Sequence, residues 1–237
     1  MNRCMYVLRK LFVLFSLGFA ATAATPIGAA EHPRPYQQQE MNLIYNLLFC
    51  DDLGLFRSKG PDPKDSPFRV LLDPNPDRQE VEKIAKNPHV ESRGRLLAFN
   101  WLRQQNFQVP SKKLLGVIVE VPQKGGLDVL AAYEDGRIRY IHQTGKLAVI
   151  EETPHEISSK VKELLSASQV AVNRMGSSEK PRRSPPTAGK IRLTFLASDG
   201  LYFVEGPFAR MQQDPVTRPI AQKASELLQL VVRATTK

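Results

Sequence analysis

The sequence predicts an α+β fold, an antiparallel β-meander covered by helices, with a candidate smaller repeated ββα unit at the C-terminus. Two observations support this prediction. Apolar and polar residues alternate in short runs separated by Gly-containing turns, a pattern typical of antiparallel hairpins. These runs are followed by segments whose apolar residues recur at helical spacing, and such helices need a sheet face to cover.

The predicted meander lies in the middle of the chain. Its runs are separated by segments containing Gly-Gly, Asp-Gly or Thr-Gly, and glycine supplies the positive φ that tight hairpin turns need. The four strand-like runs cover residues 114–121, 127–133, 137–142 and 146–151. Together they predict a four-stranded antiparallel sheet.

The first of these runs carries one carboxylate in an apolar setting. Strict alternation would place four apolar side chains on one face, those of Leu115, Val117, Val119 and Val121. Glu120 then falls on the other face. We expect Glu120 to face solvent from a half-exposed strand, and the alternative is a buried functional carboxylate.

A helix is expected directly after the meander and completes a unit over residues 111–172. Thr153 and Glu156 have the spacing of a capping box, and Pro154 would take the first helical position. Apolar residues then follow helical spacing from Ile157. The polar, proline-rich segment 173–189 that comes next predicts a flexible basic linker.

Residues 190–237 repeat this plan on a smaller scale, with a hairpin and a C-terminal helix. Gly200 marks the turn of the second hairpin and lies 64 residues after Gly136, which marks a turn of the meander. Ile220 begins the second helical pattern, 63 residues after Ile157. These offsets predict a duplicated unit, and the alternative is a second hairpin and helix without duplication.

The first thirty residues have the pattern of a secretory signal peptide. Residues 1–30 contain no Asp or Glu, have three basic residues within the first ten, and continue with an apolar run over 11–20. Small residues then offer cleavage sites after Ala23 or Ala30. We therefore expect a periplasmic or secreted protein without a transmembrane span after cleavage. An uncleaved N-terminal membrane anchor is the minor alternative.

Removal of this segment takes away three basic residues and would lower the formal net charge from +9 to +6. Cys50 would then be the only cysteine, in an apolar helical setting typical of a buried thiol. Residues 31–110 are expected to be helical and proline-rich. Helices are predicted over 41–53, 77–86 and 91–105, and five prolines predict a surface loop without regular structure over 56–77.

No local motif for catalysis or metal binding occurs in the chain. The G-x-S-x-G, Walker and G-x-G-x-x-G patterns are absent, and no two histidines or cysteines have the spacing of metal ligands. We therefore expect no metal and no cofactor. A nucleophilic site would have to join Cys50 and His142 with an acid such as Asp51 or Asp128, which linear spacing does not favour.

Five residues are the candidates for ligand binding. Basic residues gather at the third and fourth strand-like runs, and an aromatic residue lies in the loop after the last strand of the C-terminal hairpin. The set is Arg137, Arg139, His142, Lys146 and Phe208. Basic side chains of this kind could bind an anionic lipid or an anionic wall polymer. Nucleic acid is not expected as a partner, because aromatic residues do not interleave the basic ones.

The leading hypothesis is an exported, non-enzymatic envelope protein that binds or scaffolds a protein partner, as part of a larger assembly. Two alternatives belong to other classes. One is a periplasmic hydrolase with a non-local Cys/His site. The other is a protein that binds an anionic small molecule or lipid.

Overall fold

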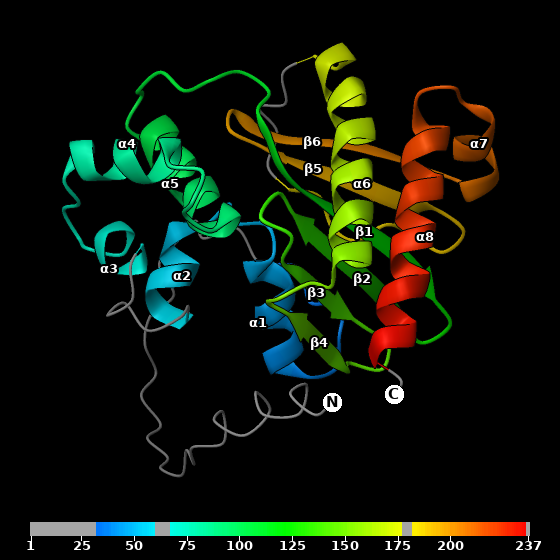
Figure 1. Cartoon of the computed structure of the whole chain (residues 1–237). Helices are drawn as coiled ribbons and strands as arrows, with labels where there is room; N and C mark the ends of the chain where they lie inside the picture. The colour runs from blue at the N-terminus through cyan, green and yellow to red at the C-terminus, as the bar shows by residue number, and fades with distance from the viewer. Residues whose placement is uncertain (1–31, 60–66, 177–181, 236–237) are drawn as a thin grey trace, which may run out of the picture. The chain divides into compact units, whose positions relative to one another are not determined.

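One six-stranded antiparallel sheet organises residues 32–59, 67–176 and 182–235, which the computed structural model describes (Figure 1). The strand order is β4-β3-β2-β1-β5-β6. The strands are β1 (Leu114–Gln123), β2 (Gly126–Tyr133), β3 (Ile138–Ile141), β4 (Leu147–Ile150), β5 (Ile191–Ala197) and β6 (Gly200–Gly206). The predicted α+β fold is confirmed, while the predicted signal peptide lies outside the described residues.

Helices cover both faces of this sheet. The N-terminal helices are α1 (Gln39–Leu47), α2 (Leu53–Lys59), α3 (Phe68–Leu71), α4 (Arg78–Lys86) and α5 (Ser92–Gln104). The later helices are α6 (His155–Arg174), α7 (Phe208–Gln213) and α8 (Thr217–Thr235). In Figure 1, α6 and α8 lie side by side over one face, and α1 lies behind the sheet. The helices on each face pack against the sheet around a separate hydrophobic core, so the sheet is apolar on both faces.

The hairpins of the meander form where the glycines predict them. Gly136 and Gly145 have φ values of +87° and +80°, which residues with a Cβ rarely adopt. These turns connect β2 to β3 and β3 to β4, and the strands pair in sequence order. The second predicted hairpin, β5–β6, joins the same sheet because β5 pairs with the free side of β1. Whether the two units are a duplication stays a prediction.

The predicted face of β1 is wrong at one position. Val117, Val119 and Val121 contribute to the core under α6 and α8, but Leu115 packs in the core on the opposite face. The pairing of β1 with β5 shifts register between Leu114 and Gly116. An irregularity of this kind reverses the alternation beyond it, and residue spacing within a single run does not reveal it.

The first helix is shorter than predicted. It ends at Leu47, and Cys50 takes a left-handed conformation with a φ of +53° that breaks the helical path. Asp52 then starts α2, because its Oδ1 accepts a hydrogen bond from the backbone N–H of Leu55 at 2.9 Å. The chain therefore turns between two helices where periodicity predicts one.

The proline-rich segment contains regular structure, which corrects the prediction of an uninterrupted loop over 56–77. Helix α2 continues to Lys59, and α3 follows Pro67, which occupies the N-cap position. Proline is tolerated at a helix start because the backbone N–H it lacks has no helical partner there. Residues 60–66 of this segment lie outside the described residues.

Two of the predicted helix starts have different outcomes. The side chain of Asp77 accepts a hydrogen bond from the N–H of Glu80 at 3.0 Å and begins α4 as predicted. The capping box predicted at Thr153 is wrong, because Pro154 itself is the N-cap of α6 and no side chain caps that end. Spacing alone does not distinguish a side chain that reaches the backbone from one that does not.

Both described ends of the predicted linker contact or continue elements of the fold. Its first residues extend α6 to Arg174, and Arg182 is anchored against α1. Residues 177–181 lie outside the described residues. Phe208 begins the short helix α7, which the sequence patterns do not indicate.

Candidate functional site

The two candidate arginines are held in ion pairs. Arg137 lies 2.9 Å from Asp135 and 2.7 Å from Glu151, measured between guanidinium nitrogens and carboxylate oxygens. Arg139 is buried, pairs with the same Glu151 carboxylate and donates to the carbonyl of Ile138. An anion binding here would have to compete with Glu151 for both guanidinium groups. The positive charges of Arg137 and Arg139, which were predicted to bind a ligand, are thus neutralised by carboxylates of the protein itself.

The other three candidates do not join these arginines. The Nδ1 atom of His142 lies 2.9 Å from the hydroxyl of Thr144, inside the β3–β4 turn, and Lys146 is exposed just before β4. Arg137 and Glu151 lie at the other end of the same hairpin. Phe208 begins α7 after β6, the strand at the opposite edge of the sheet. The five residues therefore form no common site.

Cys50 and His142 also lack a shared environment. The thiol of Cys50 is buried, contacts the carbonyls of Leu47 and Leu48 at 3.7 Å, and has Arg93 beside it. Burial raises the pKa of this thiol to about 12, despite the opposing effect of Arg93. The contacts of His142 are with Thr144 and Tyr140. This arrangement does not favour a Cys–His nucleophile.

We expect Cys50 to resist thiol reagents in the native protein. A thiol with so high a pKa is protonated at neutral pH, and its burial blocks access as well. The measurement is labelling by a maleimide in a Cys4→Ser background, with and without denaturant. Slow labelling that becomes complete on unfolding is the expected result, whereas rapid native labelling would contradict the buried position.

Glu120 is fully buried, which corrects the prediction that it faces solvent. Helix α1 covers its face of the sheet, and the hydroxyl of Tyr45 donates a 2.7 Å hydrogen bond to Oε1. The Oε2 atom lies 3.8 Å from Nη1 of Arg192 and accepts no hydrogen bond within the described chain. Removal from water raises the pKa of this carboxyl, and Tyr45 and Arg192 partly oppose the shift.

Neighbouring residues extend this buried polar cluster. Arg192 binds Glu205 through Nε and Nη2, at 3.0 and 2.6 Å. Arg182 donates to the backbone and side-chain oxygens of Asn46, and its guanidinium lies 4.2 Å from the centre of the Phe49 ring. The cluster therefore ties α1, the sheet and the segment before β5 together. These contacts indicate a structural role, because they connect segments that are far apart in the sequence.

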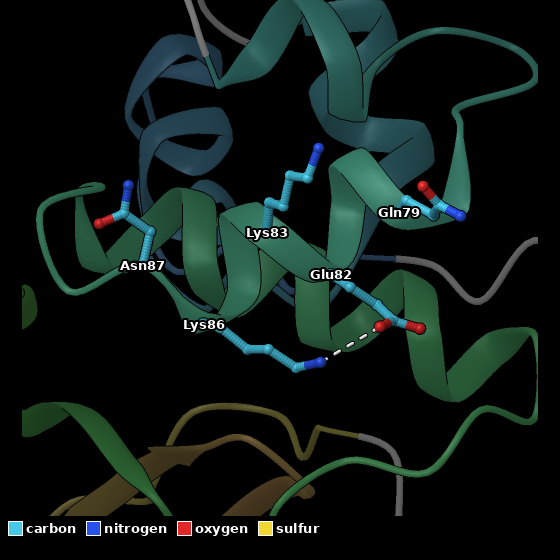
Figure 2. A pocket seen from close by; sticks show the side chains of 5 residues that line it. All are labelled: Gln79, Glu82, Lys83, Lys86 and Asn87. Carbon is cyan, nitrogen blue, oxygen red and sulfur yellow. Dashed lines mark hydrogen bonds and ion pairs between the residues drawn. The ribbon is translucent and has the colours of Figure 1, made fainter.

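One depression lies on the surface of α4 and is lined by Gln79, Glu82, Lys83, Lys86 and Asn87 (Figure 2). Figure 2 shows Lys86 turned toward Glu82, while Lys83 extends away from both. Glu82 is already paired with Arg78 and Lys86, at 2.7 and 3.1 Å. A single helix face with internally paired charges offers few converging groups for a small ligand.

A second depression lies between α4, the end of α5 and the segment that follows α5. Phe99, Leu102 and Val109 contribute apolar surface, and Arg78 and Glu82 line its polar side. Its volume is about 240 Å³, below the range of roughly 300–1,000 Å³ that is common for small-molecule sites. Within the described ranges no group of three or more His, Cys, Asp or Glu could hold a metal ion. No described helix is long and apolar enough to cross a membrane.

The outer edge of β4 is the most distinctive exposed feature of the described chain. Leu147 and Val149 are 37% and 47% exposed, large values for apolar side chains that alternate on one strand. Both belong to the face that carries Arg139 and Ile141 on β3, since Val149 pairs with Arg139 and Leu147 with Ile141. Among the described residues, β4 has a partner strand only in β3.

The backbone of β4 also has hydrogen-bonding groups that point outward. The N–H of His142 donates to the carbonyl of Lys146 at 2.8 Å, which fixes the alternation of the β3–β4 ladder. Backbone groups alternate in direction along an antiparallel strand, so the N–H and C=O of the next residue, Leu147, point away from β3. The N–H and C=O of Val149 point the same way. Each presents an N–H and a C=O to any strand that lies alongside. An edge with these properties can accept another strand.

Sequence reasoning identified this strand but not its exposure. The run 146–151 alternates no differently from the buried runs before it. Its shortness and its place as the last run of the predicted meander are the signals that could have marked it as an edge. The last strand of a meander has a neighbour on one side only, and the observed order β4-β3-β2-β1-β5-β6 places β4 outermost.

Comparisons with known proteins identify no relative. No protein-family model, no curated protein and no solved structure matches the chain.

Proposed function

We propose that this chain is an exported, non-enzymatic envelope protein that binds a protein partner through the outer edge of β4. The observation that carries the proposal is the pair of exposed apolar side chains, Leu147 and Val149, on a strand whose backbone groups point outward. A partner that adds a strand there would gain backbone hydrogen bonds and cover both side chains. The export part of the proposal rests on the pattern of residues 1–30.

The charge distribution supports a protein partner over an anionic ligand. Glu151 occupies both candidate arginines, and Arg192 and Arg182 bind acidic or amide groups inside the protein. Lys146 at one end of β4 and Glu152 beyond the other are exposed. An edge with an apolar centre and one charge of each sign near its ends suits a polypeptide strand better than a polyanion.

The test is cross-linking in intact cells that express the full chain, with Leu147→Pro as the blocking variant. The N–H of Leu147 points away from β3, so proline removes an outward donor and leaves the β3–β4 hydrogen bonds in place. We expect cross-linked adducts of the unaltered protein to disappear in Leu147→Pro.

The matched control is Val170→Lys on α6, which replaces an apolar side chain that is 52% exposed and lies away from β4. This variant should keep the adducts. Equal adduct yields from Leu147→Pro and the unaltered protein would rule out the β4 edge as the binding surface. A circular dichroism melt of both variants establishes that each is folded.

A further inference from the structure

We infer that the strand bound at β4 is β4 of a second copy of this chain, so that two sheets join into one continuous antiparallel sheet. This inference rests on the proposed function, since it names the partner of the same edge. The two copies would be related by a twofold axis that is perpendicular to the sheet and passes midway between the two Ala148 residues, which is the usual symmetry of such a pairing.

The backbone alternation selects the register. Only Leu147 and Val149 of β4 present their N–H and C=O outward, so hydrogen-bonded pairs must join these two residues. Pairing Leu147 of each copy with Val149 of the other makes four backbone hydrogen bonds. All four apolar side chains then lie together on one face, where each is exposed in the single chain.

The charges at the strand ends favour the same antiparallel arrangement. Lys146 precedes β4 and Glu152 follows it, and both are exposed. Antiparallel pairing in this register sets the Lys146 side of one copy toward the Glu152 side of the other, within reach of long side chains. Parallel pairing would instead bring like charges together. Glu151 takes no part, because Arg137 and Arg139 hold its carboxylate.

Ala148, the residue next to the twofold axis, fits this geometry. Ala148 would face its own copy across a non-hydrogen-bonded pair, where Cα atoms lie about 4.5 Å apart. A small side chain suits this close position. The other edge of the sheet is a poorer candidate, because the large apolar side chains of β6 are partly or fully buried.

The test is spontaneous disulfide formation by Ala148→Cys in a Cys4→Ser background, since a separation of about 4.5 Å lies within the range that a disulfide spans. We expect a covalent dimer to form under air oxidation. Val170→Cys, exposed on α6, is the matched control and should stay largely monomeric under the same conditions. Sedimentation velocity of the purified protein should show a dimer whose fraction rises with concentration and falls more than about tenfold in Leu147→Pro.

Two results would overturn the inference. One is a monomer at every concentration, and the other is no faster dimerisation of Ala148→Cys than of Val170→Cys. The cellular cross-linking experiment separates this failure from that of the proposed function. A Leu147-dependent adduct with a mass other than twice that of the chain overturns the second copy but supports the β4 edge. If no cross-linked adduct depends on Leu147, both the second copy and the β4 edge are overturned.

Discussion

Replacing Arg192 with methionine is expected to lower the free energy of unfolding by about 3–5 kcal/mol, because it leaves a buried carboxylate without its countercharge. Arg192 is 5% exposed and Glu120 is fully buried. The guanidinium also binds Glu205, which would keep only its 3.7 Å ion pair with Lys190. Urea unfolding of the variant and the unaltered protein measures the difference.

The loss of stability in Arg192→Met should be larger at high pH than at low pH. Burial raises the pKa of Glu120 in the folded protein, and removal of Arg192 takes away an influence that lowers it. When the pKa of a carboxyl is higher in the folded protein than in the unfolded chain, its contribution to stability is complete at pH values below the pKa of the unfolded chain. This contribution is lost as the pH rises through the pKa of the folded protein. The loss should therefore be smaller at about pH 4 than at about pH 8.

The double variant Arg192→Met, Glu120→Gln is the control for this explanation. Glutamine can still accept the hydrogen bond of Tyr45 but carries no charge. Part of the stability lost at the higher pH should return, and the pH dependence should weaken. A loss in Arg192→Met that is the same at both pH values would contradict the role assigned to Glu120.

Replacing Tyr45 with phenylalanine should lower the free energy of unfolding by about 2–3 kcal/mol, because the hydroxyl makes a charge-assisted hydrogen bond to the buried carboxylate of Glu120. Without it, neither oxygen of Glu120 accepts a hydrogen bond from the described chain. Thermal or urea unfolding at neutral pH measures the change.

Tyr36→Phe provides the matched control for Tyr45→Phe. Tyr36 is also buried and packs edge-on against Tyr45, but its hydroxyl donates to the neutral carbonyl of Leu127 at 2.8 Å. Loss of the Tyr36 hydroxyl should lower the free energy of unfolding by about 1 kcal/mol. In a Glu120→Leu background, Tyr45→Phe should lower the free energy of unfolding by a smaller amount, because no buried carboxylate remains. Equal costs for the two tyrosine variants would argue against a charge-assisted bond.

The features that sequence predicted correctly are those set by near neighbours. Gly136 and Gly145 determine their turns, and each turn connects strands that are adjacent in the sequence. The cap at Asp77 likewise depends on a backbone group three residues away. Such features require only a few residues to interact, so spacing and residue type carry the necessary information.

The features that sequence could not predict depend on distant contacts. Glu120 is buried because Tyr45, 75 residues earlier in the chain, brings α1 over it. Arg182 looked like part of a solvated linker, yet it is 136 residues from Asn46, to which it binds. Neither pairing has a local pattern.

Hydrogen exchange at the individual amides of β4, followed by NMR through a dilution series, tests the pairing of two β4 strands most directly. The amides of Leu147 and Val149 should exchange slowly at high protein concentration and rapidly on dilution. The amide of Ala148, which faces β3, should be protected throughout. Rapid exchange of Leu147 and Val149 at every concentration, with Ala148 still protected, would contradict the pairing.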